Sequence, residues 1–139
     1  MKRNLQFKKV LQINADNALK VVTNFNKYED FVPGCTGASL ISRNPPIEIG
    51  RLEFNILGKK YFIESRNEIL ENSINIEQLK GPFDNFSGKW TVKKTDKDFC
   101  EVCFHAQFEL PFLLNAIIPQ SLVESFSTNI IESFIKEAQ

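Results

Sequence analysis

Two cysteines three positions apart are the first residues of this sequence whose types and spacing suggest chemistry. Cys100 and Cys103 form a C-x-x-C pattern, which is typical of redox-active thiol pairs and of half a zinc site. The pattern lies in residues 99–110, where apolar and polar residues alternate as in a β-strand. Residues three apart on a strand point to opposite faces of the sheet. The two thiols therefore do not share a ligand easily, and we predict neither a metal site nor a redox pair here.

Other catalytic groups are also poorly placed for chemistry. His105 is the only histidine, and the same alternation places it on the polar face of its strand, beside Glu101 and Gln107. A Cys–His or Ser–His pair needs its histidine next to the nucleophile. No carboxylate falls on the inner side of a predicted strand as a general acid or base, and the six glycines form no phosphate-binding loop. The sequence thus favours a binding protein, without a cofactor, over an enzyme.

Composition narrows the class of partner. The 139 residues carry a formal net charge of zero, whereas proteins that bind nucleic acid through its phosphates normally have a basic excess. Phenylalanine is unusually frequent, with 13 residues against one tryptophan and two tyrosines. These rings supply apolar area without a hydrogen-bonding group, which suits a lipid pocket and a plain hydrophobic core equally well. We expect a hydrophobic small molecule as the ligand and no contact with DNA.

The sequence also indicates where the protein works. Its three cysteines are an odd and sparse set, unlike the disulfide framework of a small secreted protein. Residues 1–13 lack the apolar core of a signal peptide. No apolar run reaches the roughly 18 residues that would span a bilayer. We therefore expect a cytoplasmic protein with at most a peripheral contact with the inner membrane, and one domain over residues 1–139 because no linker divides the chain.

The order of periodic segments predicts an α+β fold. Alternating apolar residues from Leu5 to Ile13 predict a strand, and Asn14 or Asp16 can cap a helix over residues 18–25 that continues over 28–32. Six further strands are predicted at residues 38–42, 47–56, 61–69, 73–79, 86–92 and 99–110. Helical spacing of apolar residues then runs over 122–135. We expect a curved antiparallel sheet of about seven strands wrapped around a long C-terminal helix, with two short helices after the first strand.

Strand parity separates a wet face from an inner face. In residues 61–69 the charged side chains share one face, which places Ser65 and Asn67 on the inner face. In residues 99–110, Phe104, Ala106 and Phe108 point inward by the same rule. A curved sheet that is covered by a single helix tends to leave space between the two layers, where ligand pockets form. We therefore predict an apolar cavity with a few polar groups.

An apolar cluster at residues 112–118 follows the last strand, near the expected entrance of the cavity. If the cluster is exposed, Phe112, Leu113 and Ile117 are candidates for contact with a membrane. A buried helix start explains the same cluster equally well.

One segment is more specific than the rest. It reads Leu79-Lys80-Gly81-Pro82-Phe83-Asp84-Asn85-Phe86-Ser87-Gly88-Lys89-Trp90. Gly81 and Pro82 predict a tight turn that Phe83 anchors, Gly88 lets the next strand bend, and Trp90 packs beneath it. A well-packed hairpin by itself accounts for all of these features.

The same segment resembles the L-x-G-P-F…L-x-G-x-W motif of the coenzyme Q-binding START-like family, which includes the bacterial RatA proteins. Residues 28–35 resemble the family's Y-P-x-F-L-P-W-C, with Glu29 and Gly34 in place of its proline and tryptophan. Arg66 and Asn67 match an R-N pair that precedes the main motif. Residues 133–138 resemble A-F-x-x-R-A, with Glu137 at the basic position. The resemblance extends over nearly the whole chain.

The resemblance implies a START-like helix-grip fold. It also implies non-enzymatic binding of a polyprenyl quinone such as ubiquinone, or a similar lipid, in support of respiration or quinone biosynthesis. For some bacterial members it implies instead a toxin that binds the large ribosomal subunit and blocks its association with the small one. The absence of the tryptophan at Gly34 leaves the expected pocket mouth without a large ring. The residues that we expect to line the ligand site are Phe31, Ser65, Asn67, Gln78, Phe83, Trp90, Phe104, Ala106, Phe108, Phe126 and Ile130.

Of these two functions, lipid binding ranks first because of the charge balance and the predicted pocket. Ribosome binding would use lysines on strand ends and turns, for instance Lys59, Lys60, Lys93, Lys94 and Lys97. The neutral net charge argues mildly against it, because contact with ribosomal RNA depends on phosphate electrostatics. A cyclase or dehydrase activity ranks third, since no acid or base is placed for it.

Overall fold

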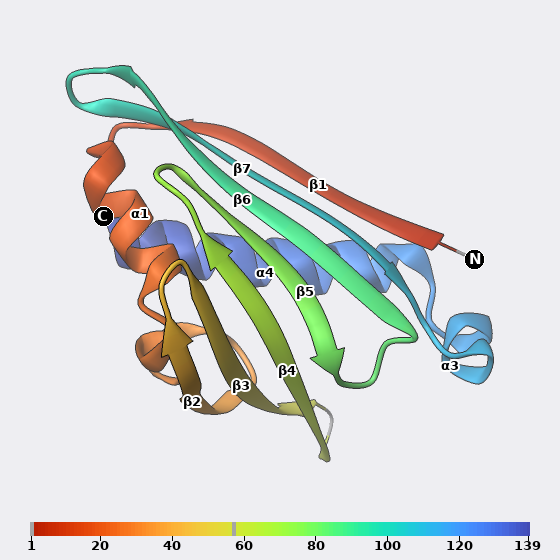
Figure 1. The fold of residues 1–139 in the computed structure, drawn as a ribbon. Coiled ribbons are helices and arrows are strands. Elements are labelled where there is room, and N and C mark those ends of the chain that lie inside the picture. Colours follow the sequence, from red (N-terminus) through yellow and green to blue (C-terminus); the bar gives the residue numbers. More distant parts are fainter. Residues whose placement is uncertain (1, 57) are drawn as a thin grey trace.

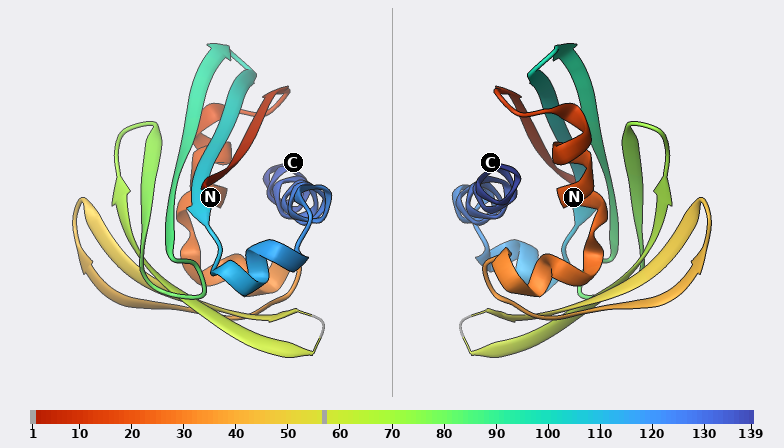
Figure 2. Two further views of the ribbon diagram at one scale, coloured as in Figure 1. Left: turned by 90° about the vertical axis from the view of Figure 1, so that its right-hand side faces the viewer. Right: turned by 90° about the vertical axis from the view of Figure 1, so that its left-hand side faces the viewer.

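A curved antiparallel sheet surrounds one long helix in the computed structural model, which describes residues 2–56 and 58–139 (Figures 1 and 2). The strands are β1 (Lys2–Leu11), β2 (Cys35–Asn44), β3 (Ile47–Ile56), β4 (Lys59–Ile69), β5 (Ser73–Lys80), β6 (Asn85–Asp96) and β7 (Phe99–Glu109). The helices are α1 (Ala15–Thr23), α2 (Tyr28–Phe31), α3 (Phe112–Ile117) and α4 (Gln120–Ala138), with a short 3-10 helix, η1, at Phe25–Lys27.

The seven strands form one sheet in the order β1-β7-β6-β5-β4-β3-β2. Every pairing in it is antiparallel. The first strand therefore returns to pair with the last, and β1 and β2 become the two edges. Seen along α4, the sheet curls around the helix, while α1 and α2 lie at one end and α3 at the other (Figure 2). This confirms the predicted sheet of seven strands, the long C-terminal helix and the short helices after the first strand.

A side-chain cap and a close contact between a ring and a glycine fix the position of the helices that follow β1. The Asn14 side chain accepts a hydrogen bond of 2.8 Å from the Asp16 backbone N–H, so Asn14 is the N-cap, one of the two residues proposed for that role. The helix starts at Ala15, earlier than predicted, and ends at Thr23. Phe25 belongs instead to η1, where its ring lies over β3. A Cβ atom on Gly50 would stand 2.6 Å from that ring, so only glycine fits there.

Strand bounds differ from the prediction where pairing departs from simple alternation. The segment predicted as residues 38–42 is part of the longer β2, whose pairing with β3 shifts register between Cys35 and Gly37 and between Leu40 and Ser42. Such irregularities break the period of two from which a strand is recognised in a sequence. β6 likewise continues to Asp96 because β7 pairs with it that far. The first strand ends at Leu11 rather than at Ile13.

The hydrophobic core lies toward the end of the sheet that α1 and α2 cover. Of the residues of α4, Ile131 and Phe134 in its C-terminal half are buried, whereas none between Gln120 and Ile130 is. The remaining buried members of the core are Leu11, Ile13, Ala18, Val22, Val32, Cys35, Ile74, Trp90, Val92, Cys100 and Val102. Among the described residues, no helix is both long and apolar enough to cross a membrane.

Candidate functional site

A polar pair lies on the inner face of β4. Ser65 and Asn67 are both buried, and the Ser65 hydroxyl donates a hydrogen bond of 2.9 Å to Asn67 Oδ1. Their predicted position on the inner face is confirmed, since Asn67 pairs with the half-buried Ile76 of β5. The hydrogen bonds found among the described residues do not use the Asn67 amide nitrogen. The pair therefore leaves a hydrogen-bond donor on the inner face.

Glu48 stands beside this pair, although the sequence analysis placed no carboxylate on the inner face. It lies opposite Asn67 in the β3–β4 pairing, and its side chain is only 14% exposed. Its Oε1 atom lies 3.9 Å from Nε of the largely exposed Arg43. The expectation of no inner carboxylate was wrong for this residue. Strand parity could have found it, because Glu48 shares a face with Leu52, which packs against the core.

Gln78 was predicted as a free polar group of the site, but its side chain is engaged by a loop. It lies opposite Ser65 in the β4–β5 pairing. Its Nε2 atom donates to the Phe83 carbonyl at 2.9 Å, and its Oε1 atom accepts from the Phe83 N–H at 3.4 Å. A Cβ atom on Gly81 would collide with Gln78 Oε1, so glycine is required for this arrangement. Gln78 thus fixes the turn between β5 and β6.

Three phenylalanines pack beneath that turn. The Phe83 ring centroid lies 5.2 Å from that of Phe86 and 5.3 Å from that of Phe108. Phe108 is buried and Phe83 is half-buried. The predicted anchoring of the loop by Phe83 is confirmed, and the three rings form an apolar wall near the α3 end of the sheet.

A second aromatic cluster occupies the opposite end. Trp90 is buried, with its ring 4.7 Å from Phe104 and 5.1 Å from Phe134 of α4. Phe31 of α2 lies 5.2 Å from the same Phe134 ring, nearly perpendicular to it. As expected, Trp90 joins the sheet to the helix. Any contact of Phe31 or Trp90 with a ligand has to form at the margin of this packed cluster.

The other predicted site residues lie between the two clusters. Ala106 is fully buried and pairs with Gly88 on one side and Leu5 on the other. Phe126 and Ile130 of α4 are half-buried, as is Phe104 on the sheet. Of the residues predicted for the site, the structure buries Ser65, Asn67, Trp90, Ala106 and Phe108 and leaves Phe104, Phe126 and Ile130 half-buried. The inner surface thus has a closely packed end, around Trp90 and Phe134, and a more thinly covered end toward α3.

The C-x-x-C thiols fall on opposite faces, as strand parity predicted. Cys100 has no exposed surface, whereas Cys103 is half-buried and donates a hydrogen bond of 3.7 Å to Glu101 Oε1. Burial raises the pKa of both thiols, and the nearby Glu101 carboxylate raises the pKa of Cys103 further. His105 is exposed on the outer face. Cys103 and His105 therefore lie outside the inner surface, whereas Cys100 is part of the core.

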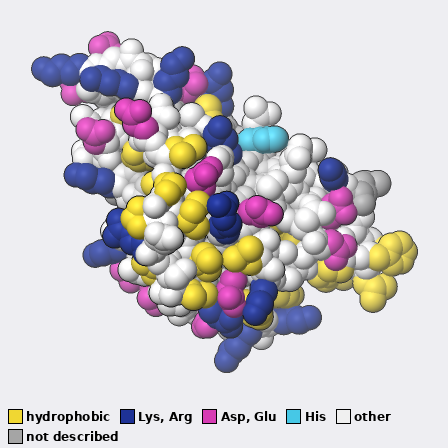
Figure 3. Space-filling model, viewed as in Figure 1, with side chains coloured by type: hydrophobic (Ala, Val, Ile, Leu, Met, Phe, Trp, Pro, Cys, Tyr) yellow, Lys and Arg dark blue, Asp and Glu magenta, His cyan; other side chains and the backbone are white. Residues whose placement is uncertain are grey.

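The apolar cluster after β7 is exposed, which decides between its two interpretations. On α3, Phe112 is 84% exposed, Leu113 76% and Ile117 74%. They form the apolar projection at the right of the space-filling view (Figure 3). The sequence analysis left open whether these residues begin a buried helix, and the structure shows that they do not.

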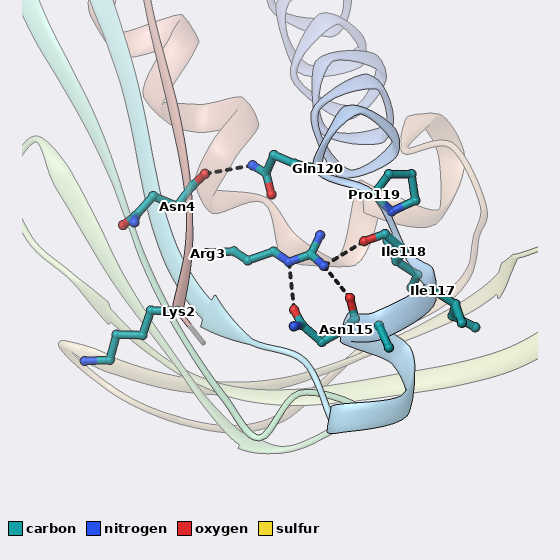
Figure 4. A pocket seen from close by; sticks show the side chains of 9 residues that line it. Lys2, Arg3, Asn4, Asn115, Ile117, Ile118, Pro119 and Gln120 are labelled. Atoms are coloured by element: carbon teal, nitrogen blue, oxygen red, sulfur yellow. Dashed lines mark hydrogen bonds between the residues drawn. The ribbon is translucent and has the colours of Figure 1, made fainter.

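Two open hollows mark the surface of the described residues. One, of about 870 Å³, lies where β1 meets the α3–α4 connection (Figure 4). The other, of about 600 Å³, lies mainly on the outer face of the sheet, where Arg66, Lys89 and His105 line it, and it reaches Gln78 and Phe86 where β5 and β6 part. Both hollows adjoin the thinly covered end of the sheet.

Comparison with known proteins places this geometry among proteins of one fold. An Escherichia coli protein named ribosome association toxin RatA is 24% identical over 127 residues, which cover 91% of this chain and 80% of that protein. The solved structure of the Zhui aromatase/cyclase from Streptomyces superposes with a TM-score of 0.86 at 17% identity, covering 99% of this chain and 94% of that one. A START superfamily protein from Mycobacterium smegmatis superposes with a TM-score of 0.78 at 16% identity, covering 96% and 92%.

The fold is therefore a START-like helix-grip, as the sequence resemblance implied. These relatives include both a toxin and an enzyme, so similarity alone does not choose between binding and catalysis. A match over residues 11–135 shows that the chain belongs to the family described as polyketide cyclase / dehydrase and lipid transport.

Proposed function

We propose that this protein binds a polyprenyl quinone such as ubiquinone, or a similar lipid, between the inner face of the sheet and α4. The observation that carries the proposal is the buried Ser65–Asn67 pair on a surface that is built mostly from apolar side chains. Membership of a family that includes lipid transport supports it. The thin cover of Phe126 and Ile130 over this part of the sheet supports it as well.

A quinone needs both kinds of surface that this region offers. Its ring carbonyls accept hydrogen bonds, and the Asn67 amide nitrogen is the donor placed for one of them. Its isoprenoid tail needs apolar walls, which Phe104, Phe126 and Phe108 supply. The ring is therefore proposed to lie by β4 and the tail to run toward α3.

We favour binding over catalysis, although Glu48 is an inner-face carboxylate. The histidine faces outward, and Glu48 has the exposed Arg43 as a charged neighbour, while the Tyr28 hydroxyl near it donates to the Val22 carbonyl. Glu48→Gln is expected to retain ligand affinity within about twofold, because no charged group is needed to recognise a quinone. The ligand recovered from wild-type protein should be chemically unchanged, and conversion of an added ligand would contradict this part of the proposal.

The test uses the one tryptophan of the chain as a reporter. A short-chain ubiquinone analogue is titrated while the fluorescence of Trp90 is followed, and organic extracts of gently purified protein are analysed by mass spectrometry. Asn67→Leu is expected to weaken binding about tenfold, the effect of losing one buried hydrogen bond. Gln107→Leu, on the exposed outer face, is the matched control and should bind as wild type. Equal affinity of Asn67→Leu and wild type would reject the proposed ring position.

A second candidate function follows from the similarity to the ribosome association toxin over 91% of this chain. The exposed lysines that would contact ribosomal RNA count against it. Lys59 and Lys60 lie at the β3–β4 hairpin, whereas Lys93, Lys94 and Lys97 lie at the β6–β7 hairpin, at the opposite side of the sheet (Figure 1). Two separate groups offer less phosphate contact than one patch. Sedimentation with large ribosomal subunits in a sucrose gradient, by protein free of lipid, would favour this function over lipid binding.

A further inference from the structure

We propose that the α3 end of the molecule docks on anionic membranes, with Arg3 as the binding residue for a lipid headgroup phosphate. The inference rests on the proposed lipid-binding function and adds the surface and the headgroup chemistry through which lipid would be exchanged. It starts from Arg3, which reaches from β1 to the α3–α4 connection (Figure 4).

Arg3 has fixed geometry and no anionic partner. Its Nε atom donates to Asn115 Oδ1 at 2.9 Å, and its Nη2 atom donates to the carbonyls of Asn115 and Ile118 at 3.0 and 2.6 Å. The remaining nitrogen, Nη1, is buried and has no partner among the described residues. None of the ion pairs found among those residues involves Arg3. A guanidinium held by neutral acceptors, with one nitrogen unpaired, is incompletely satisfied, and an oxyanion is its natural complement.

The hollow in front of Arg3 suits an anion. It has a volume of about 870 Å³, and its nine lining residues include Lys2 and Arg3 but no carboxylate. Lys2 projects to the other side of β1, where Glu109 lies opposite it in the strand pairing (Figure 4). Arg3 is thus the cation that remains for a ligand. The N-terminus of the 19-residue helix α4 begins at Gln120 in the same hollow and adds its positive end.

The surroundings of the hollow identify a membrane as the source of the anion. Residues 110–123 contain no charged side chain, a long interval for a protein with 24% charged residues. Within them, Phe112, Leu113 and Ile117 are the most exposed large apolar side chains of the described chain. Apolar side chains that project beside a cation match the bilayer interface, where the rings enter the acyl boundary and the cation meets the phosphates. A free phosphate would use Arg3 but would leave the apolar projection unexplained.

Cosedimentation of the full chain with lipid vesicles tests the inference. Wild type should bind vesicles of phosphatidylcholine with one quarter phosphatidylglycerol, and it should bind pure phosphatidylcholine much less. The double variant Phe112→Ser, Leu113→Ser should lose at least tenfold in partitioning without unfolding, because both side chains are exposed. Ile41→Ser, on the edge strand β2 and 52% exposed, is the matched apolar control and should bind as wild type.

The headgroup site has its own variants. Arg3→Gln should lose roughly fivefold in binding to the anionic vesicles, the effect of about one basic residue near a charged surface. Arg3→Lys should lose less, because it keeps the charge but not the fork of donors. Lys9→Gln removes the same charge from an exposed position farther along β1 and should change binding less than twofold. Arg3 also holds the α3–α4 connection, so the melting temperature is measured for each variant. If Arg3→Gln does not fold, the Phe112→Ser, Leu113→Ser variant tests the membrane contact instead, because both of its side chains are exposed.

Three outcomes would overturn the inference. The first is equal binding to neutral and anionic vesicles. The second is wild-type binding by the Phe112→Ser, Leu113→Ser variant. The third is binding of inorganic phosphate at Arg3, or self-association through α3, without any affinity for vesicles. Retention of ubiquinone analogue binding in these cases would leave the proposed lipid function intact, whereas vesicle binding without quinone binding would reject that function alone.

Discussion

The two halves of α4 cover the same sheet to different depths. Phe134, in the C-terminal half, is buried and meets Tyr28, Phe31 and Trp90 at centroid distances of 5.0 to 5.2 Å. Phe126, two turns earlier on the same helix, is only half-buried. One end of the grip is therefore a packed core that holds the helix, and the other is a surface where a ligand can replace missing contacts. Under the proposed function, this difference would separate stability from ligand binding along a single helix.

Trp90→Ala is expected to have the largest effect, because it removes the ring that joins β6 to α4. Deletion of a large buried ring costs about 3–5 kcal/mol in the free energy of unfolding. Urea denaturation followed by circular dichroism measures the change. A variant that keeps wild-type stability but loses ligand binding would show that Trp90 belongs to the site rather than to the core.

Two identical substitutions on α4 compare its halves directly. Phe134→Ala should cost about 3–5 kcal/mol, as for any fully buried ring. Phe126→Ala should cost about 1 kcal/mol, because much of its ring is already in contact with solvent. It should nevertheless weaken binding of the ubiquinone analogue. Similar losses of stability at the two positions would mean that the N-terminal half of α4 is packed as tightly as the C-terminal half, and the comparison would fail.

Tyr28 should make the stability of the packed end of the molecule depend on pH. Its hydroxyl donates to the Val22 carbonyl, and burial, with a further contribution from the Glu48 carboxylate, raises the pKa of Tyr28 well above its ordinary 10.0. Above pH 10 the unfolded chain loses this proton while the folded chain keeps it, so stability is complete below about pH 10 and falls as the pH rises further. Tyr28→Phe should cost about 1 kcal/mol at pH 7. It should also reduce the fall in stability between pH 9 and 11, measured by urea denaturation.

The smallest effect concerns thiol reactivity in the native protein. Cys103 should react with a thiol reagent at least tenfold faster than Cys100, because Cys100 has no exposed surface and lies on the inner face. Labelling followed by mass spectrometry of tryptic peptides measures both rates. Equal rates would mean that the packed end opens as easily as the surface, or that the register of β7 is different.

Much of the fold was predictable because it depends on local periods. Alternation located all seven strands to within four residues at each end, and it placed Ser65 and Asn67 on the inner face without any long-range information. The prediction was least accurate for β2, where two register shifts remove the alternation. For the site, Ser65, Asn67, Ala106 and Phe108 are buried as strand parity predicted, but Gln78 is engaged by the Phe83 backbone. The side-chain partners in a turn depend on its path in three dimensions.

The sequence by itself determined which face each strand residue occupies, because successive side chains on a strand must alternate. It therefore settled the separation of Cys100 from Cys103 and the polar character of the inner pair. Only the tertiary structure decided how deeply each part of α4 is covered and which distant groups meet. Arg3 and Asn115 are 112 positions apart, and Glu48 reaches Asn67 through a strand pairing. The period of a sequence predicts which way a side chain points but not how deeply it is buried, because burial depends on which other segments pack against the same face.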